Sequence, residues 1–122
     1  MKKLAAIFTV LFLCFACDKD ELPEVETLDV IAIDGLTVEL GGIVHSEGGT
    51  GGQVHRRGIV WNAGSARPTV DKHDGMSTSG VGAGDFSVVI IVPSAGEYSF
   101  RAFATNQRGT VYGSRKTFTA VE

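Results

Sequence analysis

The sequence predicts an all-β protein, an antiparallel two-sheet β-sandwich of about seven short strands. Three features of the chain favour this fold. Apolar residues recur with a period of two in short runs, which is typical of half-buried strands. Gly, Pro, Asn and Asp separate these runs, and all 16 glycines fall at or after Gly35, as in a turn-rich domain. Beyond the first 16 residues, no segment has a helical apolar stripe.

The strands are expected over 28–33, 37–46, 56–62, 76–81, 85–91, 97–105 and 110–119. After the first of them, Asp34-Gly35 predicts a two-residue hairpin turn, because both central positions of a type I′ turn require φ > 0. The stretch from Asn106 to Gly109 predicts a second tight turn. Seven strands of this length in about 95 residues suit a sandwich better than a barrel with a cavity.

The strand expected over 97–105 has the clearest alternation. Tyr98, Phe100 and Ala102 share one face, whereas Arg101 and Phe103 lie on the other. A tyrosine that opens the penultimate strand fits a tyrosine corner, in which the hydroxyl bonds to backbone upstream and the ring joins the core. Phe103 either covers the outer surface of its sheet or marks a contact patch.

The remaining aromatic residues are expected to serve mainly in burial. Trp61 shares a face with Ile59, which favours a packed core position over a sugar-stacking platform. The residues expected in the core are Ile59, Trp61, Phe86, Tyr98, Phe100, Tyr112 and Phe118.

Several segments together resemble a known domain family. These are Arg57-Gly58-Ile59-Val60-Trp61-Asn62, Arg67-Pro68-Thr69, Gly84-Asp85-Phe86-Ser87, the run from Tyr98 to Asn106, Gly109-Thr110-Val111-Tyr112-Gly113 and Thr117-Phe118-Thr119. In order and spacing they resemble the fibronectin type III-like domain of Bacteroidota surface proteins. The resemblance implies an immunoglobulin-like sandwich used for adhesion, spacing or binding, without catalysis of its own.

The first 16 residues have the pattern of a secretory signal peptide. Lys2 and Lys3 precede an apolar run from Leu4 to Ala16, which is too short for a membrane span of about 20 residues. Its end, Cys14-Phe15-Ala16-Cys17, resembles the lipobox of bacterial lipoproteins. That resemblance implies cleavage before Cys17 and lipidation of this cysteine. Cys14 is a poorer candidate, because a bulky leucine precedes it.

The residues after the cysteine are expected to form an acidic tether over 17–27, followed by the sandwich over 28–122. Lys19-Asp20-Glu21 resembles the signal that sends Bacteroidota lipoproteins to the outer face of the outer membrane. A solvated acidic linker is the alternative reading of the same residues. The expected location is therefore the outer membrane, lipid-anchored and exposed at the cell surface, with the periplasmic face as the alternative. Two or three acyl chains give stable anchoring without a transmembrane helix.

Charge separates the tether from the domain and excludes one class of partner. Removal of residues 1–16 takes two lysines from the 11 basic residues and leaves all 14 acidic ones. Seven acidic residues and one basic residue then lie in 17–34, whereas 35–122 is nearly neutral. A domain without a cluster of positively charged side chains binds phosphate backbones weakly, so nucleic acid is not an expected partner.

No cofactor, metal or catalytic residue is expected. The glycine runs 48–52 and 80–84 lack the residues that complete a phosphate-binding or dinucleotide-binding loop. His45, His55 and His73 lie far apart in sequence without cysteines or paired acids at ligand spacing. A glycosidase that uses Asp71 and Glu97 is the least favoured reading, because so small a sandwich has little room for a cleft.

Two non-catalytic functions remain. The first is a binding or adhesion module that takes a protein or glycan through loops at one end of the sandwich, since two polar or Gly-rich loops span 46–54 and 106–109. The candidate ligand contacts are His55, Arg56, Phe103, Asn106, Gln107 and Arg108. The second is a structural spacer or envelope-assembly component that pairs with a partner through an exposed edge strand.

Overall fold

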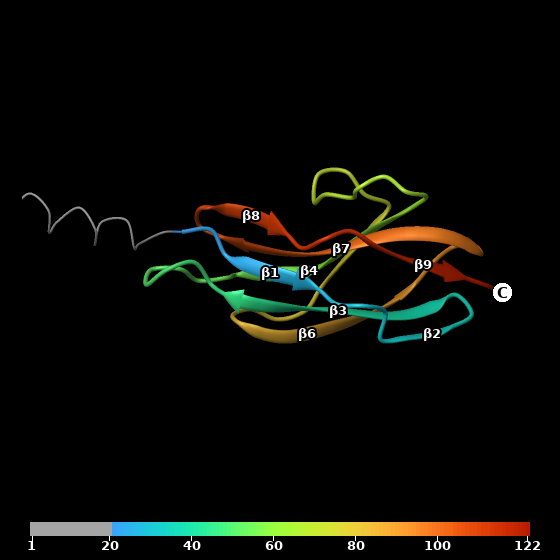
Figure 1. Ribbon diagram of the computed structural model, residues 1–122, viewed down its shortest axis with the longest axis horizontal. Helices are drawn as coiled ribbons and strands as arrows, with labels where there is room; N and C mark the ends of the chain where they lie inside the picture. Colours follow the sequence, from blue (N-terminus) through green and yellow to red (C-terminus); the bar gives the residue numbers. More distant parts are fainter. Residues whose placement is uncertain (1–20) are drawn as a thin grey trace, which may run out of the picture.

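The computed structural model describes residues 21–122, which form an all-β domain of two antiparallel sheets (Figure 1). This confirms the predicted fold class at the level of a β-sandwich. The signal peptide, Cys17, Lys19 and Asp20 lie outside the described residues. The described part contains no helix that is long and apolar enough to cross a membrane.

The first sheet is built around its longest strand, β3 (Thr37–Ser46). On one side of β3, β1 (Glu24–Thr27) pairs with residues 42–46 and β2 (Ala32–Asp34) with residues 37–39. On the other side, all eight residues of β6 (Gly84–Ile91) pair with β3 in unbroken register. The strands β1 and β2 therefore share one position in the sheet.

The second sheet has four strand positions. Its elements are β5 (Gly75–Thr78), β4 (Arg56–Ala63), β7 (Gly96–Asn106), β8 (Gly109–Tyr112) and β9 (Lys116–Ala120). The order runs β5, β4, β7, and then β8 and β9, which pair with successive stretches of β7. The two sheets together have seven strand positions, some of them filled by two short segments.

Alternate residues of both sheets meet in the core. Val38, Leu40 and Ile59 have no exposed area, and the buried Phe100 ring packs against Phe118, with centroids 5.9 Å apart. Of the residues expected in the core, Ile59, Trp61, Phe86, Tyr98, Phe100 and Phe118 lie there.

Tyr98 and Trp61 pack edge to face, with ring centroids 5.8 Å apart. The Tyr98 hydroxyl donates to the Ser94 carbonyl at 2.7 Å, which is the upstream bond expected of a tyrosine corner. Trp61 pairs across β4 and β5 with Gly75. A Cβ at Gly75 would run into the indole ring, so glycine there leaves room for the tryptophan.

The structure corrects two predictions, the strand over 28–33 and the tether over 17–27. The chain pairs with β3 from Glu24 to Thr27, and again only from Ala32. Between these stretches, four residues, 28–31, face two residues of β3, so the strand is interrupted by a bulge. The folded domain therefore begins earlier than residue 28.

The strand expected over 110–119 is also two strands, because residues 113–115 break its pairing with β7. Thr27 of β1 fills this break. Its hydroxyl accepts a bond from the Ala102 amide at 3.0 Å, and its side chain is 2% exposed. Gly113 lies against Thr27 so closely that a Cβ would not fit.

The structure shifts one predicted turn, agrees with the other and shortens one predicted strand. The first hairpin turn has Gly35 and Leu36 at its centre, one residue later than predicted, because Asp34 pairs with Thr37. Gly35 has φ 66°, which glycine adopts readily. The second turn is as predicted, with two residues between paired Asn106 and Gly109. The strand expected over 76–81 ends at Thr78.

A loop over residues 64–74 covers the outer face of the second sheet, at the top of Figure 1. On this outer face, Val60 and Phe103 are completely buried, although neither belongs to the core between the sheets. The loop is fastened by the Tyr112 hydroxyl, which accepts from the Val70 amide at 2.8 Å, and by Arg101, which donates to the Pro68 carbonyl. Tyr112, expected in the core, therefore lies half-buried on this outer face.

Candidate functional site

One end of the sandwich gathers three segments that are far apart in sequence. They are the β3–β4 loop (47–55), the β5–β6 loop (79–83) and the β7–β8 turn (107–108). Glu21 lies at the same end, since its amide donates to the Gly48 carbonyl at 3.2 Å. Figure 1 places this end opposite the C-terminus. We call this region the loop end.

Asn106 holds two of these segments together. Its amide group donates to the carbonyls of Glu21 at 2.6 Å and Glu47 at 2.9 Å. Its carbonyl oxygen accepts from the backbone amides of Arg108 and Gly109. The side chain is 3% exposed. Asn106, predicted as a ligand contact, is therefore a structural residue of the loop end.

Arg57 organises the β5–β6 loop. Its guanidinium donates to the carbonyls of Ser79, Gly82 and Ala83 at 2.7, 3.0 and 3.1 Å. It also lies over the Phe86 ring, 5.3 Å from the centroid, which suits a cation–π contact. The loop is tied to its neighbour by a bond from the Gly82 amide to the Val54 carbonyl.

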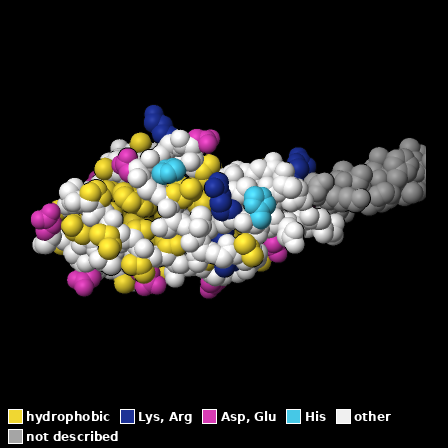
Figure 2. Space-filling view, turned by 180° about the vertical axis from the view of Figure 1, so that it is seen from behind, with side chains coloured by type: hydrophobic (Ala, Val, Ile, Leu, Met, Phe, Trp, Pro, Cys, Tyr) yellow, Lys and Arg dark blue, Asp and Glu magenta, His cyan; other side chains and the backbone are white. Residues whose placement is uncertain are grey.

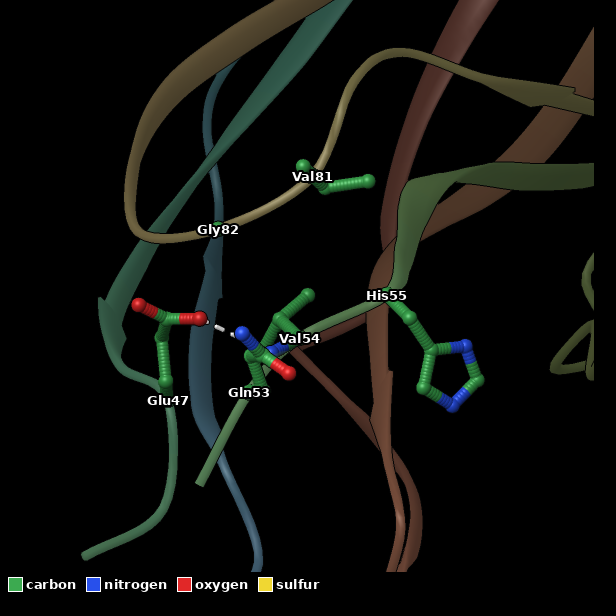
Figure 3. A pocket seen from close by; sticks show the side chains of 6 residues that line it. All are labelled: Glu47, Gln53, Val54, His55, Val81 and Gly82. Carbon is green, nitrogen blue, oxygen red and sulfur yellow. Dashed lines mark hydrogen bonds between the residues drawn. The ribbon is translucent and has the colours of Figure 1, made fainter. Parts of the chain in front are cut away.

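A shallow pocket of about 340 Å³ opens between the β3–β4 and β5–β6 loops. It is lined by Glu47, Gln53, Val54, His55, Val81 and Gly82 (Figure 3). The Glu47 carboxylate accepts from the Val54 amide at 2.8 Å, which fixes the acid on one wall. Figure 3 shows the His55 ring pointing away from this carboxylate and Val81 across from Val54. The volume is at the lower end of the range for ligand pockets.

The groups around this pocket suit a polar, uncharged or weakly cationic ligand. Glu47 supplies acceptor oxygens, Gln53 supplies an amide, and His55 supplies ring nitrogens. Val81 is 65% exposed and offers a small apolar surface. Hydrogen-bonding groups around a small apolar contact are the chemistry that binds sugars and peptide backbone.

The other predicted ligand contacts divide into two groups. His55, Gln107 and Arg108 are exposed at the loop end, and the Gln107 side chain donates to the Gly51 carbonyl at 2.7 Å. Phe103 is fully buried on the outer face of the second sheet and is not available to a ligand. Arg56 lies on that outer face, 5.5 Å over the Phe103 ring.

Outside the loop end, Arg101 is a charged residue that serves the fold. Arg101 lies 4.3 Å over the Tyr112 ring. Burial lowers the pKa of the Arg101 guanidinium, the nearby charge of Arg67 lowers this pKa further, and Tyr112 raises it. Arginine remains charged at all physiological pH values, so the contact persists.

No group of three potential metal-ligating side chains occurs within residues 21–122. His45 bonds to Glu26 at 2.7 Å on the first sheet, and the His73 ring bonds to the Thr69 carbonyl. Asp71 and Glu97, the pair considered for a glycosidase, are exposed, and neither lines the pocket.

Glu47, Gln53 and Arg57 were not among the predicted functional residues. For Arg57, the nearest sequence signal is a cation at the start of a strand, followed 23 residues later by a glycine run. Nothing in the sequence shows that β4 and this run meet, because the contact depends on the pairing of β4 with β5, the strand that precedes the run.

No protein-family model matches this chain, and no curated protein is significantly similar to it.

Proposed function

We propose that this chain is a non-catalytic, lipid-anchored binding module of the outer membrane, built on an immunoglobulin-like sandwich of the fibronectin type III-like kind. The observation that carries the proposal is the loop end. Three segments from different strands are held in place there by Asn106, Arg57 and Glu47 around an open polar pocket. Loops fixed on a rigid sandwich are the usual binding surface of such domains.

The seven strand positions support the immunoglobulin-like assignment. Three positions lie in one sheet and four in the other. That division, the Tyr98 corner and the buried Trp61 are features of immunoglobulin-like sandwiches.

The position of Glu21 restricts where the ligand lies. If Cys17 carries the acyl chains, four peptide steps separate it from Glu21, and these reach at most about 14 Å. Glu21 bonds to the loop end. The loop end then faces the membrane, and its ligand is a protein or glycan at the membrane surface itself.

Site-specific photo-crosslinking on intact cells tests this binding function. A photoreactive residue at Gln53 should capture one defined protein or glycan, and capture should fall when Glu47 is replaced by alanine. The same group at Thr119, exposed on β9 near the other end, is the matched control. No adduct at Gln53, or equal adducts at both positions, would reject the loop end as the binding site.

The second candidate function is a spacer or envelope-assembly component that pairs through an edge strand. A specific observation favours it, because the outer edge of β6 pairs with no other strand in residues 21–122. If an envelope protein pairs with β6, a mutant that lacks this protein should show stronger chemical labelling along β6. Unchanged labelling in every envelope mutant would count against this role.

A further inference from the structure

We propose that β6 is a self-association edge, through which two copies of this chain join in antiparallel fashion to form one continuous sheet. Edge strands carry a row of unpaired backbone groups that pair with another strand unless the edge is protected. The structure shows an edge that is long, regular and unprotected.

The direction of the free backbone groups follows from the ladder. The Val92 amide donates to the Leu36 carbonyl at 2.9 Å, directly beyond the β3–β6 pairs. Successive residues of a strand point their amide and carbonyl groups to opposite sides. The even-numbered residues of β6 therefore face β3, whereas the groups of Ser87, Val89 and Ile91 face the open edge.

The usual protective devices are missing from β6. Its eight pairs with β3 run without a bulge, and the strand contains no lysine, arginine or proline. The other outer strands of the two sheets have only three to five residues each. β6 is thus the longest open edge in the described part of the chain.

The outward side chains of the second half of β6 are apolar and poorly covered. Val89 is 62% exposed and Ile91 is 72% exposed, with Ile31 on the neighbouring strand position at 48%. Val89 lies with Ala32, Ile33 and Glu39 around a small hollow of about 180 Å³. Figure 2 shows one face on which hydrophobic side chains gather over the half of the molecule farther from the grey trace.

The charge pattern favours a second copy as the occupant. Asp85 is the only charged residue of β6. In an antiparallel pair centred on Val89, Val89 faces Val89 of the second copy, and Ser87 faces Ile91 of the second copy. In this register, side chains that point outward in one copy lie beside side chains that point outward in the other, because side chains alternate with a period of two. The two Asp85 side chains lie at opposite ends of the paired stretch, so no like charges meet.

The direction of pairing has a consequence for membranes, which rests on the proposed lipid anchor. Antiparallel copies run in opposite directions, so their loop ends, each carrying Glu21, point apart. Two anchored copies joined in this way connect two facing membranes and not neighbours in one membrane. The edge would then act in adhesion between membranes.

Light scattering on the mature chain in detergent tests the pairing. As the protein concentration increases from about 1 μM to about 1 mM, the range in which modest interfaces dissociate, the measured protein mass should rise from that of one chain toward that of two. Val89→Lys places two like charges face to face and should weaken dimerisation about tenfold or more. Thr119→Lys, on an exposed face of β9, should leave it unchanged. A wild-type chain that stays monomeric, or a Val89→Lys chain that dimerises as well as wild type, overturns the proposal.

A crosslinking measurement covers the case in which Val89→Lys does not fold. In a chain with Cys14 and Cys17 replaced by alanine, Val89→Cys should form a disulfide-linked dimer on mild oxidation, since paired strands bring facing Cα atoms about 5.5 Å apart. Thr119→Cys should not. Absence of the Val89→Cys dimer overturns the pairing.

Vesicles separate this inference from the proposed anchoring. Phosphatidylethanolamine and phosphatidylglycerol vesicles that carry the lipidated wild-type chain should cluster, and those with Val89→Lys should not. A chain that dimerises in detergent but does not cluster vesicles would leave the β6 pairing intact and reject the membrane-facing orientation.

Discussion

At the scale of single residues, Asn106 shows how far a pattern in the sequence can mislead about function. A polar residue in a turn is a reasonable ligand contact, but here its four bonds are all made within the protein. Trp61 is the opposite case. Its period-two position beside Ile59 predicts burial, and the side chain is 9% exposed. Alternation identifies the face of a residue but not what covers that face.

Replacement of Asn106 by alanine should lower the free energy of unfolding by about 2 to 3 kcal/mol, because it leaves the Glu21 and Glu47 carbonyls without their donor. Urea unfolding followed by fluorescence measures this change. Asn62→Ala is the matched control, since that amide bonds only to exposed carbonyls. Equal effects of the two substitutions would show that Asn106 has no special role.

Replacement of Trp61 by alanine should cost about 3 to 5 kcal/mol, the usual loss for a large buried aromatic side chain. Because the ring packs against Tyr98 and Gly75, the loss should appear as a large fall in melting temperature, measured by circular dichroism. A change of less than about 1 kcal/mol, the size usual for surface substitutions, would place the indole on the surface as a ligand platform.

At the scale of elements, the sequence predicts the central strands well and the outer ones poorly. The strands expected over 37–46, 56–62, 85–91 and 97–105 match β3, β4, β6 and β7 closely. The outer positions are broken, as between β8 and β9, where the Thr27 hydroxyl of the other sheet bonds to the Ala102 amide at the break. The 64–74 loop is likewise held by contacts distant in sequence. The burial of Phe103 could not be predicted either, because period-two alternation places this residue on the outer face without showing what covers it.

Tyr112→Phe tests whether this loop is a fixed cover. The substitution removes the oxygen that accepts from the Val70 amide and should destabilise the loop by about 1 kcal/mol. The Val70 amide should then exchange its hydrogen faster, while the amides of β3 keep their protection. Unchanged exchange at Val70 would show that the hydroxyl does not hold the loop. Tyr98→Phe, at the corner near Ser94, is the control that should leave Val70 protected.

At the scale of the whole molecule, the two ends of the sandwich differ in what they can meet. The loop end carries Glu21 and the polar pocket, whereas β7 begins at the other end, about 34 Å away along an 11-residue strand. The predicted tether is shortened by the residues that fold into β1 and the loop end. Sequence composition alone could not show where the tether ends, because acidic residues occur both in linkers and on exposed strands.

Depth-dependent quenching measures this orientation. A dye attached at position 53 should be quenched by brominated lipids much more strongly than the same dye at position 97, since residue 97 lies at the far end of β7 and is exposed. Both chains must carry the native N-terminal lipid. Stronger quenching at position 97 would mean that the loop end points away from the membrane.

The central claim, a domain anchored by lipid at Cys17, is tested most directly by metabolic labelling with a fatty-acid analogue in cells that express the wild-type chain, Cys17→Ala or Cys14→Ala. We predict label and membrane association for the wild type and for Cys14→Ala, and neither for Cys17→Ala, whose folded domain should melt at the wild-type temperature. External protease should also cleave the wild-type protein on intact cells. A Cys17→Ala chain that keeps its label or stays in the membrane fraction would contradict the account.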